Sequence, residues 1–286
     1  RTFFRFIKQL KNKVPENMPF EEISIDDIDI NLIKDITLTD LYEYLNYVLI
    51  ERHNNASTRS RKVSSLKSFF KYLTNKTGQL SIDPAKELDM PKRKSSLPKF
   101  LTLEQSLEML NSVNGTYKER DYCILTLFLN CGMRLSELVG INFNDIRSNN
   151  TLRLTGKGNK ERIIYLNQAC LDSINKYKKV RPVDEVIDKN ALFISKRKKR
   201  ISHKTVQYIV YKYLSAIELD NQGYSTHKLR HTAATLMYQY GNVDIRILKD
   251  ILGHSNLGTT EIYTHLSSKQ MQEAASSNPL ANIAQK

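Results

Sequence analysis

The stretch Thr226-His227-Lys228-Leu229-Arg230-His231 is the most informative part of the chain. It opens a helical pattern that continues to Tyr240, so His227 and Arg230, three residues apart, fall on one side of the helix start. An imidazole and a guanidinium placed in this way can be ordinary surface groups, or they can hold an anion. The segments around this stretch decide between the two interpretations.

Three other segments carry polar side chains beside glycines. Cys131-Gly132-Met133-Arg134-Leu135-Ser136-Glu137-Leu138 places an arginine directly after a helix break. Gly156-Lys157-Gly158-Asn159-Lys160-Glu161-Arg162 places a lysine in the turn between two short strands predicted within residues 151–166. Leu252-Gly253-His254-Ser255 supplies another histidine, and Tyr263 follows it by nine residues.

Each of these residues, taken alone, has an ordinary structural explanation. Tyr263 would be a packed aromatic side chain, Arg134 and Glu137 a helical ion pair of little energy, and Lys157 a solubilising turn residue. His254 would cap a backbone group in a turn. Every one of these explanations is preferable individually, but all of them must hold together at this order and spacing.

In order and spacing the segments resemble those of the tyrosine recombinases, the lambda-integrase class, and the chain is most similar to Xer-type site-specific recombinases. The resemblance covers nearly the whole chain and is strongest over residues 134–265, where all six expected catalytic residue types occur in family order. It implies a mainly α-helical protein with a small β-sheet or hairpin. We expect a helical core-binding domain that contacts DNA at residues 1–89, a basic linker at 90–99, and a mixed α/β catalytic domain at 100–286.

The resemblance also implies the chemistry. Cleavage of a DNA phosphodiester without a metal needs a nucleophile, neutralisation of charge on the phosphate and an acid for the leaving oxygen. By resemblance Tyr263 is the nucleophile, which forms a 3′-phosphotyrosine bond and makes ATP unnecessary for rejoining. Arg134 and Arg230 suit the phosphate, because guanidinium is planar and always charged. Lys157 is the expected general acid for the 5′-hydroxyl.

The remaining members of the expected site are two histidines and a glutamate. His254 would donate a hydrogen bond to a non-bridging oxygen, His227 would assist proton transfer, and Glu137 would orient the site. His227 and His231 stand four residues apart and could share a metal, but no glutamate lies between them, so the zinc motif His-Glu-x-x-His is absent from this stretch. We expect no metal and no cofactor.

Composition agrees with a DNA partner. The 286 residues carry 44 Lys and Arg against 30 Asp and Glu, a net charge of +14, and 40% are hydrophobic, which is enough for a folded core.

The longest apolar run, within residues 123–130, is too short to cross a bilayer. Three cysteines without a Cys-x-x-Cys pattern indicate a reducing compartment, so we expect a cytoplasmic protein. Because the chain starts at Arg1 rather than Met, we also expect residues to be missing before it.

Basic side chains predict where the DNA backbone is contacted. Within residues 57–73, Val63, Leu66, Phe69, Phe70 and Leu73 form an apolar helical stripe, and Lys and Arg occupy much of the remainder. The linker and the run at 196–200 are also basic. The expected DNA-binding residues are Arg59, Arg61, Lys62, Lys67, Lys71, Lys92, Arg93, Lys94, Lys196, Arg197, Lys198, Lys199 and Arg200.

The resemblance implies a tetramer on two DNA duplexes, either of one protein or of two paralogous recombinases, with strands exchanged in pairs through a Holliday junction and without a membrane. We expect the tail, residues 266–286, to dock on a neighbouring subunit through Leu280 and Ile283. The sequence leaves open whether the role is resolution of chromosome dimers or integration and excision of a mobile element. A type IB topoisomerase-like enzyme and a DNA-binding protein that does not cut are the alternatives; covalent attachment to DNA separates the last from the others.

Overall fold

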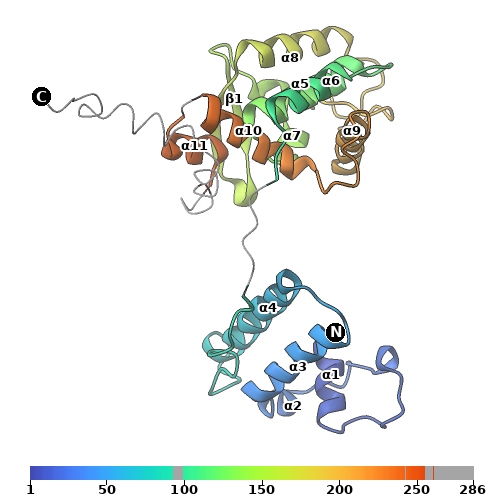
Figure 1. Ribbon diagram of the computed structural model, residues 1–286, viewed down its shortest axis with the longest axis vertical. Coiled ribbons are helices and arrows are strands. Elements are labelled where there is room, and N and C mark those ends of the chain that lie inside the picture. Colours follow the sequence, from blue (N-terminus) through green and yellow to red (C-terminus); the bar gives the residue numbers. More distant parts are fainter. Residues whose placement is uncertain (93–98, 242, 255–259, 261–286) are drawn as a thin grey trace, which may run out of the picture. The chain divides into compact units, whose positions relative to one another are not determined.

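The computed structural model describes residues 1–92, 99–241, 243–254 and 260 (Figure 1). The chain divides into two compact units, Arg1–Ser95 and Ser96–Lys286, and each has a hydrophobic core of its own. In the part of the chain that is described, no helix combines the length and the apolar character needed to cross a membrane.

The first unit is helical. Its helices are α1 (Thr2–Leu10), η1 (Phe20–Glu22), α2 (Ile30–Lys34), α3 (Leu38–Ile50) and α4 (Ala56–Asn75). Side-chain caps fix where they begin: Thr37 and Asp40 form a capping box at the start of α3, and the Asn55 side chain accepts a hydrogen bond from the backbone of Thr58 at the start of α4. The apolar stripe predicted for α4 faces the core: four of its members are buried and Phe69 is half-buried against them.

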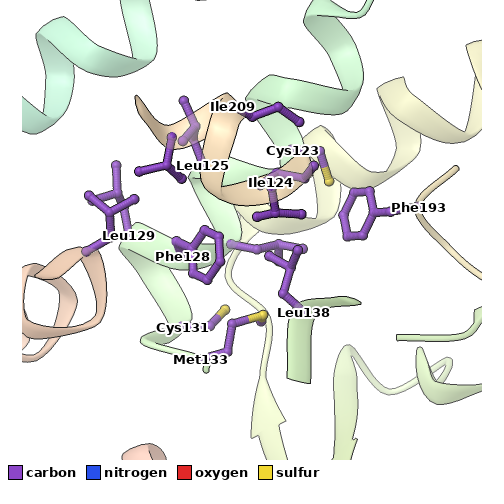
Figure 2. Packing of buried hydrophobic residues seen from close by; sticks show 14 of the residues in the cluster. Cys123, Ile124, Leu125, Phe128, Leu129, Cys131, Met133, Leu138, Phe193 and Ile209 are labelled. Carbon is purple, nitrogen blue, oxygen red and sulfur yellow. The ribbon is translucent and has the colours of Figure 1, made fainter. Parts of the chain in front are cut away.

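The second unit surrounds one apolar helix, α6 (Lys118–Cys131), which packs mainly against α8 (Gln168–Val180) and α10 (Thr226–Tyr240). Ten residues of α6 are buried, on all its sides, which is typical of a central core helix. Figure 2 shows Ile124 and Phe128 of α6 in one cluster with Leu138 and Ile209, which belong to α7 (Leu135–Gly140) and α9 (His203–Ser215). The helix α5 (Leu103–Asn111) and the 3-10 turn η2 (Phe143–Asp145) complete this part.

A β-hairpin stands beside these helices. Strands β1 (Thr151–Thr155) and β2 (Glu161–Tyr165) pair antiparallel, with Thr151 opposite Tyr165 and Thr155 opposite Glu161. The 3-10 turn η3 (Lys157–Asn159) joins them, and Gly158 adopts φ +73°, a conformation that favours glycine. The predicted pair of strands around a glycine turn is therefore confirmed.

Two helices end at glycines that the sequence singled out. Gly132 ends α6 and Gly253 ends α11 (Ile245–Leu252), both in the left-handed conformation, with φ +57° and +64°. A Cβ at position 132 would lie only 2.8 Å from Cδ2 of Leu252, so α6 and α11 approach each other there as closely as glycine allows. The mainly helical fold with a small antiparallel sheet is as predicted.

Candidate active site

Arg230 lies at the centre of the candidate site, near the start of α10. Its side chain is 3% exposed. Nη1 donates a hydrogen bond to the Gly132 carbonyl oxygen at 2.8 Å, and Nη2 donates one to the Leu252 carbonyl oxygen at 2.5 Å. Because these carbonyls belong to the ends of α6 and α11, one guanidinium joins three helices. Hydrogen bonds from a charged donor are strong enough to fix its orientation.

Arg134, which directly precedes α7, and Glu137 in its first turn lie beside this group. Glu137 accepts hydrogen bonds from the backbone nitrogen of Arg134 at 2.6 Å and from its Nη1 at 2.9 Å. Nη2 of Arg134 donates to the Gly253 carbonyl oxygen at 3.0 Å. The Arg134 side chain is 39% exposed, whereas that of Glu137 is completely buried. Arg134 is thus held by its contacts with Glu137 and Gly253 and is still partly open to solvent, so an external anion can reach it.

A third arginine, Arg162 of β2, completes the arrangement. Its Nη1 and Nη2 both donate to the Glu137 carboxylate, and its Nε donates to the Ile251 carbonyl oxygen at 3.0 Å. Arg162 belongs to the glycine-turn segment 156–162, but the sequence prediction did not include it among the site residues. A usable signal was present: Glu161, Ile163 and Tyr165 alternate with it along β2 and are exposed, which places Arg162 on the inner face of the strand.

The Glu137 carboxylate is ionised in this setting. Burial by itself would raise the pKa of Glu137, but the hydrogen bonds from Arg162 and Arg134 outweigh it, and the pKa lies below its ordinary value. Nη1 of Arg230 is 4.0 Å away and adds a third positive charge. One buried negative charge therefore organises three guanidiniums and leaves an excess of positive charge, which suits a phosphate.

His254 follows α11 directly. Its backbone nitrogen donates to the Lys249 carbonyl oxygen at 3.0 Å, and its Nδ1 lies 2.9 Å from the hydroxyl oxygen of Thr260. Partial burial, together with the positive charges of Arg230 and Arg134, lowers the pKa of His254 to about 4. At neutral pH this imidazole is uncharged, and it keeps one N–H group to donate.

His227 and His231 lie one turn apart on α10, with ring centroids 4.7 Å apart in an edge-to-face arrangement. Desolvation and the nearby charges of Arg230 and Lys228 hold the pKa of His227 below its ordinary value. Burial and the neighbouring His227 lower the pKa of His231 to about 4. Among the described residues no group of three or more histidines, cysteines and carboxylates lies together as metal ligands would.

The structure thus brings together four of the predicted catalytic and supporting residues, Arg134, Glu137, Arg230 and His254, with His227 close to the arginines. Lys157 begins the turn of the hairpin. The turn itself reaches the site, because a Cβ at the preceding Gly156 would lie 3.5 Å from Oε1 of Glu137. Tyr263 and the tail, 266–286, lie outside the described residues, as do Arg93 and Lys94.

The predicted DNA-contacting residues of the first unit differ in accessibility. Arg61, Lys71 and Lys92 are exposed, and Arg59 is half-buried. Lys62 and Lys67 are also half-buried: Nζ of Lys62 donates to the Tyr44 hydroxyl at 3.2 Å, and Nζ of Lys67 donates to the Lys86 carbonyl at 3.1 Å.

The basic run 196–200 forms a tight turn, in which Lys198 has a positive φ of 59°. Lys196, Arg197 and Lys199 are exposed there. The guanidinium of Arg200 is engaged internally instead, with the Asp188 carboxylate at 2.7 Å and with acceptors at Val139, Ile141 and Asn142. Its contacts hold the turn to the body of the unit.

Comparison with known proteins gives a consistent result. Residues 99–270 match the model of the phage integrase family. The tyrosine recombinase XerC of Caldanaerobacter subterraneus subsp. tengcongensis is 56% identical over 279 residues, which cover 98% of this chain and 79% of that protein. The tyrosine recombinase XerC of Thermodesulfovibrio yellowstonii is 34% identical, over 85% of this chain and 88% of that protein.

Solved structures share the fold at low identity. The XerH site-specific recombinase, in a post-cleavage complex with its palindromic difH substrate, aligns with a TM-score of 0.72 at 22% identity, over 86% of this chain and 73% of that one. The Tn1549 transposon integrase in complex with circular intermediate DNA aligns with a TM-score of 0.69 at 19% identity, over 97% of this chain and 99% of that one. With the family match and the XerC relatives, the conclusion is direct: the chain belongs to the phage integrase family, the tyrosine recombinases, and is most similar within it to the Xer-type members.

Proposed function

We propose that this protein is a site-specific DNA recombinase that cuts and rejoins duplex DNA through a 3′-phosphotyrosine bond, without metal or ATP. One observation carries the proposal: a buried carboxylate, Glu137, organises the guanidiniums of Arg134 and Arg230 beside the neutral His254. Two fixed positive charges and a neutral N–H donor are what a phosphodiester needs as negative charge builds up on its non-bridging oxygens. The identity to XerC relatives supports the same activity.

The cleavage step is assigned by residue type and resemblance. The phenolic oxygen of Tyr263 forms a bond to phosphorus while the bond between phosphorus and the 5′-oxygen breaks. Lys157 gives a proton to the departing 5′-oxygen, and the phenolic proton passes to His227. A histidine whose pKa lies below its ordinary value is unprotonated at neutral pH, so it can accept this proton. Rejoining is the reverse: the 5′-hydroxyl attacks the phosphotyrosine and Tyr263 leaves.

Arg134 and Arg230 are proposed to bind the phosphate, together with His254. The Arg134 side chain is 39% exposed, and its guanidinium would bind a non-bridging oxygen directly. Arg230 is more deeply buried and would contact the phosphate through the face turned to the site. His254 would donate its remaining N–H to the other non-bridging oxygen.

DNA binding outside the scissile phosphate is proposed for both units. Arg61 and Lys71 of α4, and Lys92 after it, are exposed positive charges, and so are Lys196, Arg197 and Lys199 in the second unit. We propose residues 1–89 as the core-binding domain and 100–286 as the catalytic domain, joined by the basic segment 90–99. The proposed set of DNA-contacting residues is completed by Arg59, Lys62, Lys67, Arg93, Lys94, Lys198 and Arg200. Of these, Arg200 also has the internal contacts described above.

We propose that four subunits act on two duplexes, either four copies of this chain or two copies with two of a paralogous recombinase. Residues 266–286 would join neighbouring subunits through Leu280 and Ile283. Deletion of residues 277–286 is expected to abolish recombination and junction assembly while single-site DNA binding persists. Full recombination by the truncated chain would contradict this part of the proposal.

For the biological role we propose resolution of chromosome dimers, as in Xer-type systems, because the relatives of highest identity given above are XerC proteins. We also propose a cytoplasmic location, in keeping with three buried cysteines that are all free thiols. Cleavage of a mobile-element end in preference to a chromosomal site would contradict the proposed role.

Covalent trapping tests the activity. The protein is incubated with nicked suicide duplexes, drawn from chromosomal and element-end candidates, in EDTA without ATP, and is then denatured in SDS. We expect a DNA-linked band from the wild type and none from Tyr263→Phe. A band that survives Tyr263→Phe would overturn the assignment of the nucleophile, and specific binding without any band would favour a protein that does not cut.

A further inference from the structure

We propose that Arg162 is a positioning residue for strand cleavage, which acts through the Glu137 carboxylate and the end of α11 rather than on the DNA itself. The inference rests on the proposed recombinase function and extends it, because nothing in the mechanism above uses Arg162. It is carried by the contacts of this side chain, its burial and the close approach of Gly253.

The contacts of Arg162 point inward. Both terminal nitrogens donate to Glu137, and Nε donates to the Ile251 carbonyl oxygen at 3.0 Å. The side chain is 14% exposed, against 39% for Arg134. A guanidinium that donates from both terminal nitrogens to one carboxylate forms a rigid, fork-shaped pair, since two parallel hydrogen bonds fix direction as well as distance. Arg162 therefore determines where the Glu137 carboxylate lies.

Three consecutive carbonyls at the end of α11 are shared among three arginines. The oxygen of Ile251 accepts from Arg162, that of Leu252 from Arg230 and that of Gly253 from Arg134. The last carbonyls of a helix have no partner within the helix, and the helix dipole makes them favourable sites for cations. Arg162 is therefore bound to the same short stretch of backbone as Arg134 and Arg230, the two arginines proposed to bind the phosphate.

The backbone at Gly253 is shaped to admit Arg162. A Cβ at this position would lie 3.0 Å from Cδ, 3.1 Å from Nη1 and 3.3 Å from Nε of Arg162. Gly253 also has φ +64°, which disfavours other residues. His254 follows immediately, so the contact between Arg162 and this backbone bears directly on the placement of the imidazole.

These contacts predict what the loss of Arg162 does. Without its fork, Glu137 keeps its bonds to Arg134 but loses the partner that fixes it from the side of the hairpin, and the end of α11 loses one of three ties. The phosphate-binding groups shift relative to one another, and a shift of an ångström in such a site lowers a rate by up to about a hundredfold. DNA affinity, which depends on many phosphate contacts, changes little.

The experiment compares single-turnover cleavage of a saturating suicide duplex by the wild type, Arg162→Gln, Arg162→Lys and a control, Arg153→Gln. Arg153 lies on the partner strand β1 and pairs with Asp145 and Glu161, outside the site. We expect a loss of about 10- to 100-fold for Arg162→Gln, a smaller loss for Arg162→Lys, which keeps the charge without the fork, and the wild-type rate for Arg153→Gln. Wild-type cleavage by Arg162→Gln would overturn the inference.

Two further readouts separate positioning from other roles. A substrate with a neutral methylphosphonate at the scissile position needs less charge neutralisation, so the defect of Arg162→Gln is expected to shrink on it. An equal defect on both substrates would mean a general loss of structure and would overturn the inference. In a double-mutant cycle with Glu137→Gln the two losses are expected to be strongly non-additive, and independent losses would show that Arg162 does not act through Glu137.

Failure of the inference about Arg162 can be distinguished from failure of the proposed recombinase function. If the wild type forms no covalent complex on DNA that it binds specifically, the recombinase proposal fails. The same double-mutant cycle, measured on urea unfolding of the free protein, still tests the contact: coupled effects of Arg162→Gln and Glu137→Gln support it, and additive effects overturn it.

Discussion

Nδ1 of His254 lies 2.9 Å from Oγ1 of Thr260, and Thr260 is completely buried. A hydroxyl that donates to Nδ1 leaves the imidazole proton on Nε2, the ring nitrogen on the opposite side. In a histidine whose pKa is lowered to about 4, this choice decides which nitrogen can donate a hydrogen bond at neutral pH. Thr260 therefore links the state of His254 to a residue only three positions before Tyr263.

Thr260→Val is expected to lower the single-turnover cleavage rate by about tenfold, because loss of one hydrogen bond of about 1 to 1.5 kcal/mol releases the ring and its tautomer. Trapping of the covalent complex over time measures the rate. Thr235→Val is a matched control: this buried hydroxyl on α10 has no hydrogen-bond partner among the described residues, so its removal leaves the rate unchanged. Equal rates for Thr260→Val and the wild type would remove Thr260 from the site.

Stability is expected to fall as the pH is lowered from about 6.5 towards 4. The folded-state pKa values of His231 and His254 are lowered to about 4, whereas an exposed histidine titrates near 6.5. In this window the unfolded chain binds more protons than the folded one, so protonation favours unfolding, by at most about 1.4 kcal/mol per pH unit for each histidine.

Urea unfolding at pH 7, 6 and 5 measures this dependence. The charged groups that keep these imidazoles neutral are Arg134, Arg162, Arg230 and Lys228, with His227 beside them. His231→Gln is expected to flatten the dependence in part. An unfolding free energy that stays constant between pH 7 and pH 5 would contradict the lowered pKa values.

Gly132→Ala is expected to destabilise the protein by about 1 to 3 kcal/mol and to slow cleavage. The residue has φ +57°, and the added methyl would lie 2.8 Å from Cδ2 of Leu252, so backbone strain and overpacking combine. Because the Gly132 carbonyl accepts a hydrogen bond from Arg230, the movement also reaches the phosphate site.

The control for this change is Gly140→Ala. At Gly140 nothing lies within 4 Å of an added Cβ, and the backbone is not left-handed. Its unfolding free energy should remain at the wild-type value or rise by up to about 1 kcal/mol. Thermal melting of both variants gives the comparison; equal stability of Gly132→Ala and Gly140→Ala would refute the strain at position 132.

Removal of the exposed charges of α4 is expected to weaken the salt dependence of DNA binding. Each phosphate contact contributes about one unit to the slope of log affinity against log salt, so the double variant Arg61→Ala/Lys71→Ala should lose about two units. Arg52→Gln serves as the control, because this arginine already pairs with Glu21 and stacks over Phe20. An unchanged slope in the double variant would move the DNA contacts elsewhere.

Local signals in the sequence were sufficient for most elements of the fold. The helix end at Gly132 and the turn between β1 and β2 depend on the conformational freedom of glycine, and the stripe of α4 depends on helical periodicity, so neighbouring residues alone determine them. The catalytic residue types were recognised by their order along the chain.

Other features depend on distant contacts and could not be predicted in this way. Arg162 meets Glu137 across 25 residues and Ile251 across 89, so its importance is invisible in its own segment. Arg200 looked like one more charge in a basic run, but its guanidinium is used by acceptors about 60 residues earlier in the chain and by Asp188. Composition gives the number of charges, and only the fold decides which of them are already neutralised.

The arginine contacts at the end of α11 also have a consequence for synthesis of the protein. The contacts of Arg162 and Arg134 there span 89 and 119 residues. Arg230 lies only 22 residues from Leu252, but its second hydrogen bond, to Gly132 at the end of α6, spans 98 residues. Contacts at such separations form only after the entropy of closing long loops has been overcome, whereas the hydrogen bonds within each helix form locally and early. A chain on the ribosome can therefore hold most of its helices and still be unable to cut DNA. The protein can cut DNA only after the residues of α11 have emerged from the ribosome and have formed their hydrogen bonds with the three arginines.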